Sequence, residues 1–486
     1  MNKHTSQNSK YQLRLFTKIA LATCFLIILA GCGFQNYVAK PIDSAAYIAK
    51  FERKDLSSSE FNQYLLNNGY NADRLPIEKW GLDELTYCAL FFHPSLDIVR
   101  AQWRSAQLTE VTTALRAIPT INSNVAHSDD SDPTKKPFAF ALSIDIPIET
   151  ANKRNVRIEN AQHLSQITKL EIAQTAWQLR NNIAQILTEF YFNETQSRLI
   201  TEEELRRQEI VNIYLKRVSV GAASNIELSN AKLQLQTVTF ALNTVQQNKL
   251  VLLSKLASNI GLPLAKVEKM SLTNDNLRQF PAIPNTDLQT STLLNRIDIR
   301  IALERYSVAE TKLKLEIAKQ YPDIVISPGA SYEFGDNIWS LGLSGLLTLL
   351  NKNKVSIAEA TQLREVEAAQ FEALQTKVML DANIANAQVN QAKHDLENQA
   401  HVLLQQKLNT QRMQRKLAAG EIDRLEMAYA KLEDINTEKN VALANFQLNK
   451  SLDQLENTLQ KPLVTNESNS SEMVKNAIQF GAKNEP

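Results

Sequence analysis

Residues 155–220 read NVRIENAQHLSQITKLEIAQTAWQLRNNIAQILTEFYFNETQSRLITEEELRRQEIVNIYLKRVSV, without a glycine or a proline. A helix over this stretch would be about 100 Å long at 1.5 Å per residue, far longer than a helix of a compact globular domain. The run ends at Gly221, and residues 222–260 form a second run without glycine or proline. Because glycine readily adopts the left-handed conformation at helix ends, the pattern predicts a long helical hairpin that reverses at Gly221.

The same arrangement occurs a second time in the chain. Residues 346–419 contain no glycine or proline, Gly420 follows, and residues 421–461 form the next clean run. Gly221 and Gly420 lie 199 residues apart. The chain is therefore predicted to be mainly α, with duplicated long antiparallel helices. Two rows at a spacing of seven, typical of coiled-coil packing, follow the first glycine. They are Ile226, Leu233 and Phe240, and Leu228, Leu235 and Leu242.

An alternating segment precedes each long helix. A shorter helical segment stops at Pro119 in the first repeat and at Pro322 in the second, because proline cannot continue a helix. The period then changes from helical to two, which predicts β-hairpins at 119–148 and 322–349, the second turning at Gly335-Asp336-Asn337. An apolar residue stands at every second position from 138 to 148. That is about the length of a tilted membrane-spanning strand. Two hairpins packed on a soluble core remain the alternative.

A basic link joins each hairpin to its long helix. Pro147-Ile148-Glu149-Thr150-Ala151-Asn152-Lys153-Arg154 forms the first link, and residues 347–354 form the second. These cations would lie where a barrel meets the periplasm, or they belong to an ordinary solvated helix start. Both interpretations stay open at this point.

The N-terminus has the features of a processing signal. Four cations precede an apolar run that is too short to span a bilayer, and Leu29-Ala30-Gly31-Cys32 resembles a bacterial lipobox. Residues 1–31 are thus predicted to be a lipoprotein signal peptide and Cys32 a lipidated residue inserted in outer-membrane lipid; an ordinary signal peptide with a chance cysteine is the alternative. Gly33, rather than aspartate, follows the cysteine, which suggests the outer membrane.

The net charge and the placement of cysteine and histidine residues argue against nucleic-acid binding, metal binding and catalysis. Loss of the signal would leave 49 Lys and Arg against 52 Asp and Glu, a net charge of −3, which argues against binding to nucleic acid. Cys88 then stands alone as a small buried residue, without a disulfide partner. The histidines form no cluster at metal-ligand spacing and no phosphate-binding glycine loop is present. We expect no catalysis, no bound metal and no cofactor.

Together these features resemble the TolC family of outer-membrane efflux proteins. The resemblance covers nearly all of residues 80–462 and rests on the order of short motifs. The motifs are the entry Trp80-Gly81-Leu82-Asp83-Glu84-Leu85, the paired helix starts at Asp97 and Asp298, the link Ile146-Pro147-Ile148-Glu149-Thr150, and the turns ending at Gly221 and Gly420. The family implies a homotrimer with a shared 12-stranded β-barrel and a periplasmic helical tunnel. It also implies a periplasmic adaptor protein and an inner-membrane pump as partners.

The resemblance assigns roles to the two turns. In the family, such tips contact the adaptor and close the tunnel, and acidic residues after the second turn contribute to closure. The expected adaptor-contacting residues are Arg217, Val220, Gly221, Ser224, Arg415, Leu417, Gly420 and Asp423. The expected periplasmic gate comprises Asp423, Glu426 and Glu227. The chain departs from the family pattern by having Glu426 and by lacking a second acid where Tyr429 stands, so solvated helix faces remain the alternative.

The sequence therefore predicts a passive exit duct of a tripartite efflux system, of the resistance-nodulation-division type. The alternatives are a type I secretion outlet, which shares the fold, and a non-channel periplasmic coiled-coil lipoprotein. The predicted divisions are a signal at 1–31, an anchored segment at 32–79, the first repeat at 80–262, a linker at 263–293, the second repeat at 294–462 and a disordered tail at 463–486.

Overall fold

A computed structural model describes residues 35–129, 136–273, 296–345 and 352–463. It contains two compact units, residues 1–53 and 54–486, which are described separately. The described part of the first unit contains helix α2 (Ser44–Glu52), whose N-terminus is capped by the Asp43 carboxylate. Cys32, the rest of the predicted signal, most of the predicted linker and nearly all of the predicted tail lie outside the described residues.

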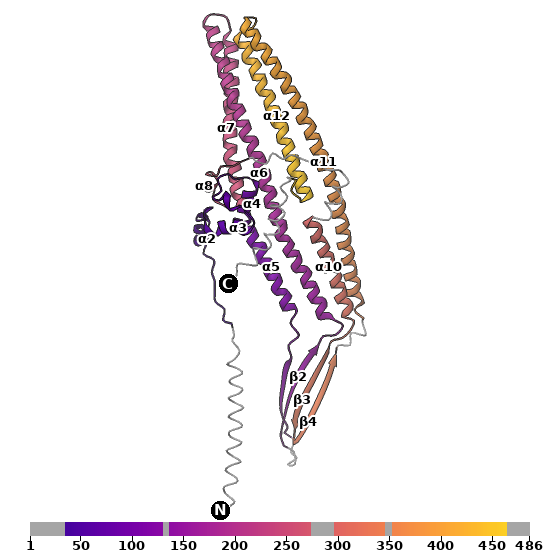
Figure 1. The fold of residues 1–486 in the computed structure, drawn as a ribbon. Coiled ribbons are helices and arrows are strands. Elements are labelled where there is room, and N and C mark those ends of the chain that lie inside the picture. The colour runs from indigo at the N-terminus through magenta and orange to yellow at the C-terminus, as the bar shows by residue number, and fades with distance from the viewer. Residues whose placement is uncertain (1–34, 130–135, 274–295, 346–351, 464–486) are drawn as a thin grey trace, which may run out of the picture. The chain divides into compact units, whose positions relative to one another are not determined.

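Two long helical hairpins dominate the second unit (Figure 1). The first consists of α6 (Lys153–Ser219, 67 residues) and α7 (Asn225–Ile260). The second consists of α11 (Lys354–Ala419, 66 residues) and α12 (Arg424–Leu459). These bounds confirm the predicted duplication and place both reversals at the predicted glycines.

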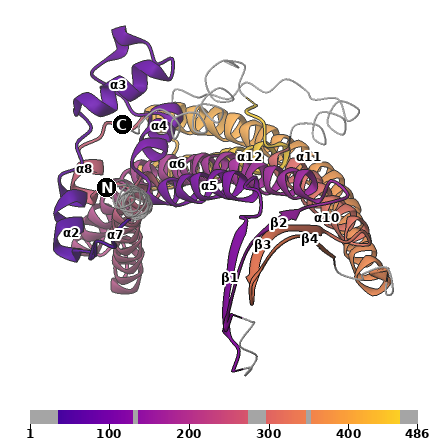
Figure 2. The ribbon, with the colours of Figure 1, turned by 90° about the horizontal axis from the view of Figure 1, so that it is seen from below.

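The helices form one curved layer, which Figure 2 shows from one end. Helix α6 packs against α7 on one side and α12 on the other, and α12 packs against α11. Nearer the sheet, α5 (Pro94–Thr113) and α10 (Ile297–Ala318) flank α6, and α10 also contacts α11. The layer therefore has α5 and α7 at one lateral edge and α11 at the other.

One four-stranded antiparallel sheet joins the two repeats at the end opposite the tips (Figure 1). Its strands, in spatial and sequence order, are β1 (Thr120–His127), β2 (Phe138–Ile148), β3 (Ile324–Glu333) and β4 (Asp336–Gly345). Both predicted hairpins are thus present, and β2 of the first pairs with β3 of the second. The two hairpins therefore form one continuous sheet, and large apolar side chains such as Trp339 and Leu341 are exposed on it.

The strand register gives the sheet one apolar face. Residues paired directly across strands point to the same side, and Leu142 pairs with Ala330, which pairs with Trp339. This face carries Ile121 and Val125 of β1, every second residue from Phe138 to Ile148 of β2, Ile324, Ile326 and Tyr332 of β3, and Trp339, Leu341 and Leu343 of β4. The opposite face carries small and polar residues such as Ser143, Ser327 and Ser340.

The predicted position of the second turn was wrong. Glu333 pairs with Asp336, so the turn consists of Phe334 and Gly335, and Asp336 already belongs to β4. Both turn residues have positive φ, +49° and +134°. A two-residue turn fits the twist of paired strands better than the longer one that the sequence suggested. The predicted strand residues Leu347 and Leu349 lie outside the described residues.

The main hydrophobic core lies halfway along the long helices. Helices α3 (Ser59–Asn67) and α4 (Leu82–Phe92) pack there against the middle of α6 and the end of α7. The fully buried side chains Tyr64, Leu85, Ile183 and Ile260 belong to this core. The short helix α8 (Leu264–Val267) follows α7, and Trp80 pairs with the strand-like segment at Leu272.

A buried ion pair lies beside this core. Arg180 of α6 donates to the Glu456 carboxylate of α12, and their side chains are 5% and 3% exposed. Farther along the same two helices, toward the tips, the Thr188 hydroxyl donates to Asp453 at 2.7 Å. These contacts fix α6 and α12 in one register across the two repeats.

None of the described helices combines the length and the apolarity that a membrane-spanning helix requires.

Candidate functional site: the helical tips and the joint between sheet and helices

The two tips are built in the same way. After α6, the amide of Gly221 donates to Val218 O at 3.0 Å and that of Ala222 donates to Arg217 O at 2.7 Å. After α11, Gly420 donates to Leu417 O and Glu421 donates to Lys416 O, at 3.1 and 2.9 Å. Both patterns close a helix around a left-handed residue, and φ is +74° at Gly221 and +76° at Gly420.

Each returning helix begins with a capping box, in which the N-cap and the third helical residue bond reciprocally. The Ser224 hydroxyl accepts from the amide of Glu227 at 3.2 Å, and the Glu227 carboxylate accepts from the Ser224 amide at 2.7 Å. Asp423 accepts from the amides of Leu425 and Glu426, and the Glu426 carboxylate faces the Asp423 amide at 3.4 Å. Both predicted gate glutamates therefore have a local capping role.

An ion pair fastens the tips to each other. Arg217, in the last turn of α6, donates to the Asp423 carboxylate at 2.5 Å. Backbone donation from Glu426 and the contact with Arg217 hold the pKa of Asp423 below its ordinary value. We call this Arg217–Asp423 pair the tip latch. The sequence predicted an adaptor contact for Arg217, and both an adaptor contact and a gate role for Asp423. It did not predict that the two residues bind each other.

A second contact joins α6 and α12 next to the tip latch, farther from the tips. Tyr214 of α6 and Tyr429 of α12 share a hydrogen bond, which raises the pKa of Tyr214 to about 12. Beneath them lies an apolar cluster in which Ile210, Leu228 and Leu432 are buried. The tyrosine pair was missed by sequence reasoning, which treated Tyr429 only as the absence of an acid. The available signal was that each tyrosine lies within about two and a half helical turns of a tip glycine, seven residues before Gly221 and nine residues after Gly420.

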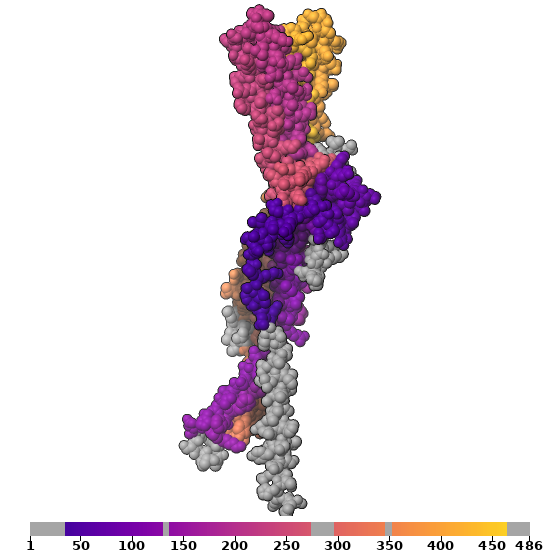
Figure 3. All heavy atoms as spheres, turned by 90° about the vertical axis from the view of Figure 1, so that its left-hand side faces the viewer, coloured from indigo at the N-terminus to yellow at the C-terminus, as the bar shows by residue number. Residues whose placement is uncertain are grey.

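The other predicted tip residues are mostly exposed. Val220 and Arg415 are exposed and Leu417 is half-buried. Figure 3 shows the two tips together at one end of the helices. The tips thus offer an accessible surface of polar and apolar side chains that surrounds the latch.

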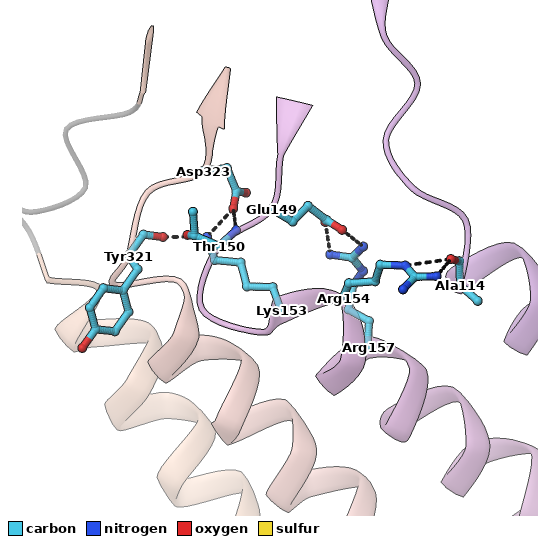
Figure 4. A network of polar contacts seen from close by, with 8 residues as sticks. All are labelled: Ala114, Glu149, Thr150, Lys153, Arg154, Arg157, Tyr321 and Asp323. Carbon is cyan, nitrogen blue, oxygen red and sulfur yellow. Dashed lines mark hydrogen bonds and ion pairs between the residues drawn. The ribbon is translucent and has the colours of Figure 1, made fainter. Parts of the chain in front are cut away.

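A second polar network lies where the sheet meets the helices (Figure 4). The ammonium group of Lys153, the first residue of α6, donates to Tyr321 O at 2.6 Å and to Asp323 at 2.8 Å. Asp323 also accepts from the Thr150 amide at 2.9 Å, and the Thr150 hydroxyl donates to Pro322 O at 2.7 Å. The link of the first repeat is therefore fixed to the strand start of the second repeat. We call this network the joint.

Two arginines extend the joint (Figure 4). Arg157 binds the Glu149 carboxylate through both terminal nitrogens, at 2.5 and 3.0 Å, a geometry that gives strong, directional pairing. Arg154 donates to Ala114 O, which is the C-cap of α5. Lys153 is buried, so the interpretation of this link as an ordinary solvated helix start was wrong for that residue.

Both links make the same backbone turn. Two successive left-handed residues precede each long helix, Ala151 and Asn152 in the first repeat and Lys352 and Asn353 in the second, with φ between +48° and +60°. The Asn353 side chain donates to the backbone oxygen of Glu316 near the end of α10. The duplication therefore extends to the conformation of single residues.

Among the described residues, no group of three or more histidine, cysteine, aspartate or glutamate side chains is arranged to hold a metal ion.

Comparisons with known proteins agree with this architecture. Residues 93–262 match the family model described as outer membrane efflux protein. The cobalt-zinc-cadmium resistance protein CzcC of Cupriavidus metallidurans is 23% identical over 265 residues, which are 53% of this chain and 60% of CzcC. The chain thus spans less than two thirds of the length of this curated relative.

Solved structures of outer-membrane proteins have the same fold. VceC of Vibrio cholerae gives a TM-score of 0.64 at 16% identity, covering 78% of this chain and 95% of VceC. The CmeC outer membrane channel of Campylobacter jejuni gives 0.64 at 14% identity, covering 82% and 89%. Residues 93–262 of this chain are therefore similar to the outer membrane efflux protein family, and its described residues share the fold of solved outer-membrane proteins such as VceC and CmeC.

Proposed function

We propose that this protein is the outer-membrane exit duct of a tripartite efflux system, passive by itself and trimeric. The observation that carries the proposal is the four-stranded sheet with one continuous apolar face. Among the described residues, none of its side chains belongs to a buried helical core. Large apolar side chains such as Trp339 (86% exposed) and Leu341 are open on this face, as they would be in contact with lipid. The small polar face would then line a water-filled passage.

Three copies complete the duct. Four strands from each of three copies give about twelve, an even number in the range of closed outer-membrane barrels. The outer strands β1 and β4 are exposed along their whole length, whereas β2 alternates between exposed and half-buried positions and β3 is mostly half-buried. Closure removes both open edges, which would otherwise recruit other strands.

The tips are proposed to contact a periplasmic adaptor protein, which connects the duct to an inner-membrane pump. Adaptor contact would involve Val220, Ser224, Arg415 and Leu417 around the two glycine turns. The tip latch is proposed to keep the entrance narrow until the adaptor binds, because it holds the two hairpins of each copy together. The carboxylates of Glu227, Asp423 and Glu426 would then form acidic rings at the entrance, where they favour cations.

Cys32 is proposed to carry the lipid that anchors the mature chain in the outer membrane. Its support is the lipobox-like sequence Leu29-Ala30-Gly31-Cys32. Metabolic labelling with radioactive palmitate should modify the native protein and leave Cys32→Ser unlabelled. Equal labelling of the native protein and Cys32→Ser would refute the lipid anchor at Cys32 and would leave the proposal of an exit duct unchanged.

The likeness to a cobalt-zinc-cadmium resistance protein makes divalent metal ions the first cargo to test. Deletion of the protein should increase sensitivity to zinc, cobalt or cadmium, and the native protein should restore resistance. An unchanged metal sensitivity together with loss of drug or protein export would assign another cargo.

Single-channel recording in a planar bilayer tests the duct itself, with the oligomeric mass determined in the same detergent. A trimer that opens small, cation-selective channels is the expected result. A monomer that never inserts would overturn the proposal and favour a structural periplasmic lipoprotein.

A further inference from the structure

The two β-hairpins are superimposable in register, not only similar in sequence. Ile121 pairs with Ile144 in the first hairpin. The counterpart of Ile121, counted from Pro119 and Pro322, is Ile324. The counterpart of Ile144, counted from the left-handed residues Asn152 and Asn353, is Gly345. Ile324 and Gly345 do pair. The two repeats therefore share one register.

The internal seam, which we define as β2 with β3 and α6 with α10 and α12, joins the first repeat to the second. Within this seam Ser143 pairs with Gly329. Counted in the same way, the counterpart of Ser143 is Ser344 on β4 and that of Gly329 is Ala126 on β1. Ser344 and Ala126 both lie on the exposed outer strands, on the small polar face.

Closure of the proposed trimeric barrel already pairs β4 of one copy antiparallel with β1 of the next. We propose that this seam between copies repeats the internal seam in register, so that Ser344 lies opposite Ala126. The inference rests on the proposed trimer and goes beyond it, because it fixes which residues meet. Strand direction agrees, since β4 and β1 run oppositely in the continuous antiparallel order.

The long helices support the same arrangement. Ile226 and Leu233 of α7 are 73% and 63% exposed, although they continue a coiled-coil row. Their counterparts 199 residues later, Leu425 and Leu432 of α12, are 8% and 3% exposed because they belong to the cluster between α12 and α6. Helix α11 is the counterpart of α6. The exposed row of α7 thus corresponds to the face that α12 buries on α6. Its partner would therefore be α11 of the neighbouring copy, the one whose β4 pairs with β1 of the same chain as this α7.

The seam between copies would lack one contact that the internal seam has. Buried Lys153 binds Asp323 in the joint. Its counterpart Lys354 is exposed in the single chain. The counterpart of Asp323 is Thr120, which has no charge. The seam between copies therefore repeats the shape of the joint without its ion pair.

Disulfide trapping tests the register. Ser344→Cys with Ala126→Cys, under mild oxidation, should give covalent dimers and trimers on non-reducing gels, because directly opposed residues are within disulfide reach. In one chain these residues lie on opposite edges of the sheet. The register places Ala126 level with Asp336, so Ser344 lies eight residues farther along β4. Three strand spacings and this offset separate the two residues by about 30 Å, so an intrachain bond cannot form. Ser344→Cys with Asn124→Cys is the matched control, two residues away on the same face.

Three results are distinguishable. Cross-linking through residue 126 but not 124 supports the proposal. A trimer by mass that cross-links only through residue 124, or through neither, overturns the register while leaving the duct intact. A monomeric mass overturns the proposed function itself.

A gain-of-contact variant provides a separate check. Thr120→Asp should raise the temperature at which the oligomer dissociates in detergent, because it supplies the missing carboxylate to Lys354 of the neighbouring copy whose β4 pairs with this β1. Thr120→Asn, and Thr120→Asp combined with Lys354→Gln, should show no increase. An equal increase in all three variants would contradict the assigned pairing.

Discussion

Arg217 and Asp423 form an ion pair of 2.5 Å that joins the end of α6 to the beginning of α12. The two residues belong to different repeats and to opposite ends of their helices. Asp423 caps α12 by accepting from two backbone amides. These hydrogen bonds orient the carboxylate independently of Arg217. The contact between the two hairpin tips that the latch provides therefore depends on the single side chain of Arg217.

Removal of the arginine should open the entrance. Arg217→Ala is expected to increase single-channel conductance, while the stability of the protein changes by less than about 1 kcal/mol, the usual range for an exposed ion pair. Lys249→Ala is the matched control, since it breaks an exposed pair with Glu194 at 3.1 Å that does not connect the tips. Equal conductance of Arg217→Ala and the native protein would refute the latch.

The latch should persist at all but strongly acidic pH. The pKa of Asp423 is lowered in the folded protein from its ordinary value of 3.8 by backbone donation from Glu426 and by Arg217. A lowered carboxyl pKa contributes stability that is complete above the ordinary value and is lost as the pH falls through the folded one. Conductance is therefore expected to stay constant from neutral pH down to about pH 4 and to rise below it. Asp423→Asn should be open throughout, and a native transition near pH 6 would implicate another group.

Charge and capping can be separated at Glu426. Glu426→Gln retains a side-chain oxygen for the capping box but removes the carboxylate, so the tip should keep its structure and lose part of its cation selectivity. Glu426→Ala should lose both. The reversal potential in a salt gradient measures selectivity, and circular dichroism measures helix content. Unchanged selectivity of Glu426→Gln would restrict Glu426 to its capping role.

The cost of replacing a glycine of left-handed conformation by alanine should depend on the atoms that surround it. A Cβ on Gly420 would meet nothing within 4 Å, so Gly420→Ala costs only the left-handed conformation, about 1–2 kcal/mol. Gly261 has a similar φ of +73°, but there a Cβ would lie 2.7 Å from Phe92 O and 2.9 Å from His93 Cα. Thermal unfolding should show a clearly larger loss for Gly261→Ala than for Gly420→Ala. Equal losses would mean that crowding at Gly261 relaxes freely.

Much of this fold can be predicted from the sequence because it depends on local rules. Long stretches without glycine or proline fix the helices, and the left-handed residues Gly221 and Gly420 fix the reversals. Strict alternation from Phe138 to Ile148 fixes β2 and its apolar face. Such features need only short-range sequence information.

Pairings between the repeats could not be predicted in the same way. Arg217 and Asp423 are 206 residues apart, and Lys153 and Asp323 are 170 apart. Their contacts depend on how α6 packs against α12 and on how β2 pairs with β3, which no local pattern specifies. Likewise, the heptad spacing of Ile226 and Leu233 predicts an apolar face but not that this face is exposed in the single chain.

The buried pair of Arg180 and Glu456 should contribute most to holding the repeats together. Glu456→Ala would leave a buried guanidinium without its carboxylate, beside the hydrophobic core, and removal of one partner of such a pair typically costs about 3–5 kcal/mol. Lys314→Ala is the matched control, because it breaks the exposed pair with Glu159 that also joins the two repeats and should cost less than about 1 kcal/mol. Thermal unfolding followed by circular dichroism distinguishes the two variants. Similar losses would show that the charge of Arg180 finds water or another partner, and that the apolar contacts between α6 and α12 fix the register of the repeats without it.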